Sequence, residues 1–136
     1  PGIAYAILGP IAAANIDVDM IVQNIGASGQ TDISFTVHRN EYRKAMDTLE
    51  RERGTSFNCR EIKGDDRIAK VSVVGIGMRS HTGLAAMMFK ALADEGINIQ
   101  MISTSEIKIA VVIDEKYLEL AVRVLHKAFE LEKAPA

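Results

Sequence analysis

The chain of 136 residues carries 16 basic and 18 acidic side chains, and 48% of its residues are hydrophobic. A net charge of -2 without any Lys/Arg cluster gives no electrostatic footprint for nucleic acid, and the apolar runs are far shorter than the roughly 20 residues that span a bilayer. The single cysteine, Cys59, excludes an internal disulfide and is typical of a reducing compartment. We therefore expect a cytoplasmic globular protein that binds neither nucleic acid nor membrane.

An internal repeat spans nearly the whole chain. Residues 82–102 align with residues 1–21 without a gap, so that Gly83 falls on Gly2. A period this long indicates two tandem domains, because the repeats of solenoids run to about 20–50 residues. The predicted domains are residues 1–64 and residues 65–136, joined within the charged, turn-forming stretch 63–67.

The first copy begins directly on a helix. Its predicted elements are a helix over 3–14, strands over 17–25 and 31–37, a helix over 40–52 with Asn40 as N-cap, and a closing strand over 56–62. Proline at position 10 costs about 3 kcal/mol inside a helix unless the helix bends or restarts there. By the repeat, an apolar strand belongs before Gly2, so we expect that a segment upstream of Pro1 is missing.

The second copy has the clearer pattern. Its predicted elements are a strand over 68–74, a loop over 75–82, a helix over 83–95, strands over 98–104 and 106–113, and a helix over 115–129. Gly96 suits a helix C-terminus and Asp114 an N-cap. The order β-α-β-β-α-β is that of the ferredoxin-like unit. We therefore predict an α+β protein with two such domains, antiparallel sheets with helices on one face, and the first strand of copy one missing.

Catalytic and cofactor chemistry find little support. The stretch 75–80 resembles part of a dinucleotide fingerprint, but Ser80 replaces its third glycine and the next strand leads directly into another strand. The histidines, His38, His81 and His126, lie far apart and give no metal-ligand spacing. We expect no metal, no cofactor and no catalytic residue.

The helix-start glycines suit a small zwitterion instead. A helix N-terminus offers unpaired N–H groups and partial positive charge to a carboxylate, and Gly2 or Gly83 permits close approach. Polar side chains that follow are Asp17, Asp19, Gln23, Asn24 and Asp32 in the first copy, and Asn98, Gln100, Ser103, Thr104 and Glu106 in the second. In the alternative interpretation, the glycines merely start helices and the polar groups are solvated.

Both copies carry motifs that resemble the tandem ACT domains of the aspartate kinases. The Pro1-Gly2 helix start and residues 15–24 and 31–37 resemble the first domain, and residues 74–83 and 97–109 resemble the second. The resemblance implies a regulatory region or β subunit that binds lysine, threonine or both for feedback inhibition of aspartate-family amino-acid biosynthesis. The chain is then no enzyme by itself, but the regulatory part of a transferase that phosphorylates aspartate.

The resemblance also implies partners and sites. A homodimer forms when the first ACT domain of one chain pairs with the second of another, beside a catalytic domain or α subunit. The first effector site would comprise Pro1, Gly2, Ile3, Ala4, Gln23, Thr31 and Asp32, completed by Asn98 and Ile99. The second would comprise Met78, Ser80, His81, Thr82, Gly83 and Leu84, with Ser103, Thr104, Ser105 and Glu106 opposite. Two alternatives stay open: a structural dimerisation module without effector, and a small enzyme with a nucleotide site.

Overall fold

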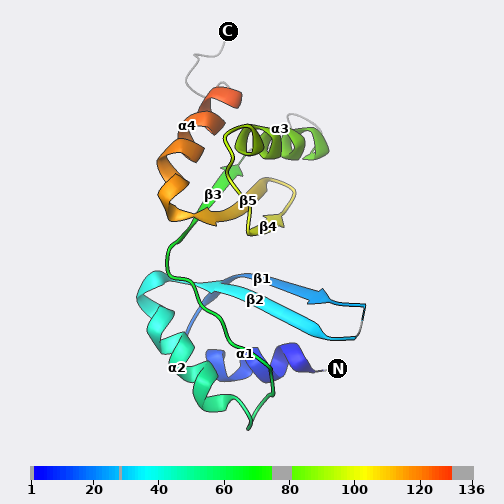
Figure 1. The fold of residues 1–136 in the computed structure, drawn as a ribbon, viewed down its shortest axis with the longest axis vertical. Helices are drawn as coiled ribbons and strands as arrows, with labels where there is room; N and C mark the ends of the chain where they lie inside the picture. The colour runs from blue at the N-terminus through cyan, green and yellow to red at the C-terminus, as the bar shows by residue number, and fades with distance from the viewer. Residues whose placement is uncertain (1, 28, 75–80, 130–136) are drawn as a thin grey trace. The chain divides into compact units, whose positions relative to one another are not determined.

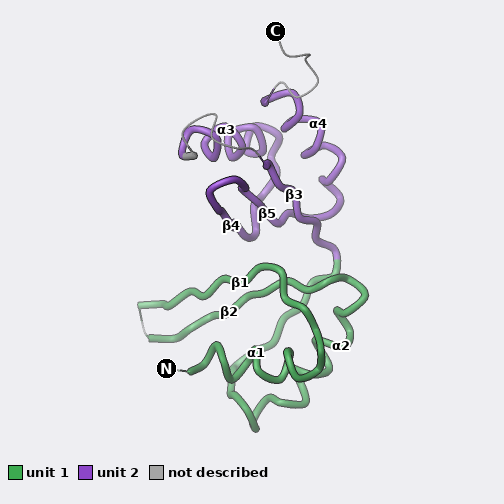
Figure 2. Tube along the Cα trace, turned by 180° about the vertical axis from the view of Figure 1, so that it is seen from behind, with its two compact units in different colours: residues 1–66 green, residues 67–136 purple. Residues whose placement is uncertain are grey.

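The computed structural model describes residues 2–27, 29–74 and 81–129. It divides into two compact units, Pro1–Asp66 (unit 1) and Arg67–Ala136 (unit 2), shown in Figure 2. Each unit combines antiparallel strands with two α-helices (Figure 1), so the predicted α+β class is confirmed. In the described part of the chain, no helix has both the length and the apolar character that crossing a membrane requires.

Unit 1 is a β-hairpin packed against two helices. Its elements are α1 (Ile3–Ala13), β1 (Val18–Ile25), β2 (Thr31–Val37), the short 3-10 helix η1 (Arg39–Glu41) and α2 (Tyr42–Glu52). The strands pair antiparallel. The core is formed by Ile11, Ile16 and Ala45, and Phe35 of β2 packs against it. Phe35 therefore marks the face of the hairpin that the helices cover.

Helix α1 keeps a proline in its interior. Pro10 lies inside the helix, and the Ala14 N–H donates to the Pro10 carbonyl at 3.0 Å, so helical bonding continues after it and the helix does not restart. The next residue, Ile11, is 1% exposed. Burying such a side chain stabilises by about 1.5–3 kcal/mol, which offsets much of the roughly 3 kcal/mol that an interior proline costs.

The closing strand predicted over 56–62 does not form. Phe57 makes only one isolated parallel bridge, with Arg53. In the β-α-β-β-α-β order the closing strand pairs with the first strand of the sheet. The sheet of unit 1 holds only β1 and β2 within the described residues, so this segment has no first strand to pair with.

Unit 2 holds a three-stranded antiparallel sheet. Its elements are β3 (Ile68–Val74), α3 (His81–Asp94), β4 (Met101–Thr104), β5 (Lys108–Asp114), the 3-10 helix η2 (Glu115–Tyr117) and α4 (Leu118–Ala128). The strand order is β3-β5-β4. All residues from Ile109 to Ile113 are buried in the central strand. Met88 and Leu92 of α3 and Leu125 of α4 pack with this strand in the core.

Element boundaries follow local hydrogen bonds. The Asp114 carboxylate accepts from the Lys116 N–H at 3.0 Å, which confirms the predicted cap, and Gly96 has the positive φ, 69°, expected after a helix. The predicted cap at Asn40 is wrong, because the Glu41 N–H donates to the His38 carbonyl and forms η1 ahead of α2. Strand β4 begins at Met101, three residues later than predicted.

Candidate functional site

In unit 1 the predicted site begins at the N-terminal end of α1. Gly2 precedes the helix with a φ of 83°, a left-handed conformation that favours glycine, and its carbonyl accepts the Ala6 N–H at 2.9 Å. No side chain caps the helix, and its first turn holds no acidic residue. The first-turn N–H groups, those of Ile3 and Ala4 among them, therefore suit an incoming carboxylate. This end of α1 lies at the same end of unit 1 as the β1–β2 turn (Figure 1).

The hairpin register divides the predicted strand residues between two faces. Thr31 is four residues from Phe35 along β2, so alternation places it on the face that the helices cover. Gln23 of β1 lies on that same face, two residues from Ile21, which pairs with Phe35. Asp32 pairs with Asn24 and lies on the opposite face. Gln23 and Thr31 thus share a side with α1, whereas Asp32 does not.

Unit 2 repeats this arrangement. Thr82 and Gly83 are exposed in the first turn of α3, after His81, and Leu84 packs against the unit 2 core. Thr104 pairs with the core residue Ile109 and therefore lies on the helix side of β4. Gln23 and Thr104 are therefore both polar residues on the helix side of an edge strand.

Three more predicted residues of the second site are neighbours of Thr104 in the chain. Ser103 pairs with Ala110 and faces away from the helices. Ser105 and Glu106 are exposed in the turn before β5, where the Ser105 N–H donates to the Lys108 carbonyl at 2.8 Å. The turn is therefore hydrogen-bonded at its base and presents its polar side chains to solvent.

The other predicted residues either lie outside the described part of the chain or, for the first site, belong to unit 2. Pro1, Met78 and Ser80 lie outside the described residues. Asn98 and Ile99 belong to unit 2, where Asn98 is exposed and Ile99 packs against the core of that unit. Their role in completing the first site stays a prediction. Among the described His, Cys, Asp and Glu side chains, no group of three could hold a metal ion.

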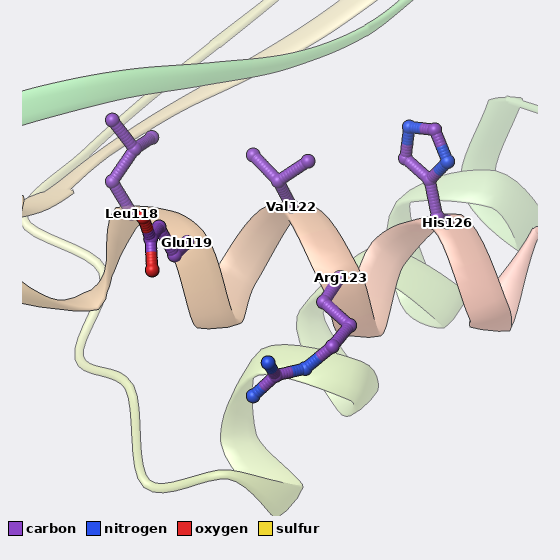
Figure 3. Close-up of a pocket in the computed structure, with 5 residues that line it drawn as sticks. All are labelled: Leu118, Glu119, Val122, Arg123 and His126. Carbon is purple, nitrogen blue, oxygen red and sulfur yellow. The ribbon is translucent and has the colours of Figure 1, made fainter.

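Two surface hollows lie away from the predicted residues. One is on α4, lined by Leu118, Glu119, Val122, Arg123 and His126; Leu118, Val122 and His126 project from the same side of the helix in Figure 3. The other, in unit 1, is lined by Tyr5, Ala6, Gly9, Pro10, Ala13, Glu52 and Ser56. The α4 hollow has a sequence signal, a leucine and a valine four residues apart on the outward side of an amphipathic helix. The amphipathic pattern predicts the helix but does not by itself single out these outward residues as a hollow.

The chain matches a protein family model and several curated proteins. A family model described as ACT domain matches residues 1–52 and 71–129. The aspartate kinase of Pseudomonas putida is 64% identical over 136 residues, which are 100% of this chain and 33% of that protein. The chain thus spans about a third of the length of the curated relatives that it matches.

Solved structures agree with these matches. A crystal structure of aspartokinase alpha and beta subunits is 59% identical with a TM-score of 0.88, covering 96% of this chain and 84% of that one. The ligand-free regulatory subunit of aspartate kinase from Thermus thermophilus is 38% identical with a TM-score of 0.85, over 94% and 84% of the two chains. The chain therefore belongs to the ACT domain family, as a regulatory region of the aspartate kinase type.

Proposed function

We propose that this chain is the amino-acid sensor of an aspartate kinase. In this proposal it binds lysine, threonine or both, and the bound effector inhibits the kinase that phosphorylates aspartate in the cytoplasm. The observation that carries the proposal is the 59% identity to an aspartokinase structure over 96% of the chain. Residues 1–64 and 65–136 are the two ACT domains of the sensor.

The proposed binding chemistry uses the helix starts. The effector carboxylate accepts hydrogen bonds from the first-turn N–H groups of α1 beyond Gly2, where the helix dipole adds favourable charge. Gln23 and Thr31, on the same side of the hairpin, accept hydrogen bonds from the effector ammonium. In unit 2, the N-terminus of α3 at Gly83 and the Thr104 hydroxyl have the same roles.

The proposed assembly is a homodimer in which unit 1 of one chain pairs with unit 2 of another. Asn98 and Ile99, from unit 2 of the partner chain, complete the first site. Ser105 and Glu106 complete the second. An effector that binds one arrangement of the paired domains more tightly shifts the attached catalytic domain or α subunit toward an inactive state. Such coupling is typically about 1–3 kcal/mol.

Titration calorimetry of the purified chain with lysine, threonine and both, beside size-exclusion chromatography, tests the proposal. Saturable binding at micromolar to millimolar concentration with a larger dimer fraction is the expected result. A folded dimer that gives no heat and no rise in melting temperature with either amino acid contradicts effector binding, because a ligand selective for the native state must stabilise it. A structural dimerisation module is then the better account.

A matched pair of variants tests the assignment of the second site. Thr104 and Ser103 are adjacent exposed hydroxyl residues on opposite faces of β4. Thr104→Val removes a hydrogen-bonding group on the helix side, and we expect at least about tenfold weaker binding at that site. Ser103→Ala removes one on the other face, and we expect less than a threefold change. Equal effects of the two variants contradict this site assignment.

A further inference from the structure

The segment that connects the two units begins at the end of α2 and runs back along this helix toward its start. Near the C-terminal end of that helix, Phe57 is buried and the Gly54 N–H donates to its carbonyl at 2.6 Å. Seven residues later, Gly64 lies against Tyr42 and Met46, in the first two turns of α2. The connection therefore contacts both ends of the helix that precedes it, a path that can be followed in Figure 1.

Arg53 fastens the first part of this path. Its guanidinium donates two hydrogen bonds, from Nε to the Cys59 carbonyl at 3.2 Å and from Nη2 to the Arg60 carbonyl at 2.6 Å. Hydrogen bonds from a charged donor are stronger than neutral ones, and the planar guanidinium fixes the direction of both. One side chain thus holds two consecutive carbonyls of a segment that forms no strand.

In the last part of this path, the backbone at Gly64 packs closely against side chains of α2. A Cβ atom at this position would lie 2.8 Å from Met46 Sδ and 2.9 Å from Tyr42 Cε1, closer than real Cβ contacts allow. Gly64 is not among the glycines with positive φ, so its backbone conformation is open to other residues. A side chain at this position would therefore have to displace the Tyr42 ring and the Met46 side chain from their packing against the connection.

We propose that residues 53–64 form a strap fastened to α2, which shortens the movable connection between the units to the stretch from Gly64 to Arg67. On the other side of that stretch, the Arg67 carbonyl accepts the Glu115 N–H of unit 2 at 3.0 Å. An extended chain spans about 3.3–3.6 Å per residue, so the strap reduces the reach of the connection from about 50 Å to about 10 Å.

Cys59 provides the readout, because it is the only cysteine of the chain and lies half-buried inside the strap. The measurement is the rate at which a thiol reagent labels the folded chain. Arg53→Ala is expected to raise this rate about tenfold. Arg53→Lys is expected to raise it nearly as much, because a single ammonium cannot reproduce the planar, two-nitrogen donor geometry. The matched control is Arg51→Ala, which removes an exposed arginine of α2 whose guanidinium forms an ion pair with Glu52.

Gly64→Ala tests the second anchor, with Gly26→Ala as its control, since a Cβ there would meet Gln30 O at an ordinary 3.5 Å. Gly64→Ala is expected to raise Cys59 labelling severalfold and to broaden the pair-distance distribution in small-angle scattering. The proposal is overturned if the labelling rates of Cys59 in Arg53→Ala and Gly64→Ala are within twofold of those in their controls. The proposal is also overturned if the labelling rate of Cys59 rises with urea concentration as steeply as global unfolding does. Local opening of the strap exposes little surface, so its free energy depends only weakly on urea.

Discussion

Truncation of Leu92 offers the sharpest test of how unit 2 is held together. The side chain is 0% exposed, between β5 and α4 in the unit 2 core. Leu92→Ala removes three methylene equivalents at about 0.8 kcal/mol each and leaves a cavity. We expect a loss of about 3–4 kcal/mol, inside the range of about 2–5 kcal/mol for buried leucines.

Leu118→Ala is the matched control, because it deletes the same atoms from a leucine of the same unit that is 39% exposed. We expect it to cost about 1 kcal/mol or less. The assay is urea unfolding followed by circular dichroism. With a slope of about 1.5 kcal/mol per molar urea, Leu92→Ala lowers the midpoint of the unit 2 transition by about 2 M, and Leu118→Ala by well under 1 M. Equal shifts for the two variants would refute the burial argument.

Three further predictions concern caps and charges. Asp114→Ala removes the acceptor of the Lys116 N–H and is expected to cost about 1 kcal/mol by urea unfolding; no change in midpoint contradicts the cap. Gly54→Ala meets open space but keeps a φ of 86°, so backbone strain alone is expected to cost about 1–2 kcal/mol in the same assay; a stabilised variant would refute this. The Lys90 pKa is raised above 10.5 by its 2.7 Å hydrogen bond and by charge interaction with Asp94; the small stability that this pair adds is present below pH 10.5 and is lost as pH rises through the folded-state pKa. Asp94→Asn removes the charge interaction and is expected to lower the Lys90 pKa toward its ordinary value in an NMR titration, and an unchanged titration contradicts the assigned cause.

Strands with strong local patterns were predictable from the sequence. The predicted bounds of β2 and β3 agree with the structure, because β-branched residues and clear turn signals delimit them. The absence of the closing strand over 56–62 was not predictable, because the pairing of such a strand depends on a neighbouring strand and not on its own residues. In this segment the Arg53 side chain donates hydrogen bonds to the carbonyls of Cys59 and Arg60. The pattern of apolar residues in the sequence does not predict these bonds.

The candidate sites were predictable at the helix starts and less so on the strands. Gly2 carries a local signal, since a glycine directly before a helix permits the left-handed conformation that the structure has there. The division of Gln23 from Asp32, and of Thr104 from Ser103, depends on the register against β2 and β5. Register is set by pairing across the sheet, so a list of polar residues near a strand end does not reveal which of them share a face.

The unequal sheets of the two units divide the stability of the chain unevenly. Strand β5 is paired along both edges, whereas within the described residues β2 is paired only with β1. A two-stranded hairpin is marginal without support from packed helices, and the core of unit 1 is correspondingly smaller than that of unit 2. We therefore expect unit 1 to be the first cooperative segment to open under native conditions, and the amides of β5 to be the last to exchange with solvent.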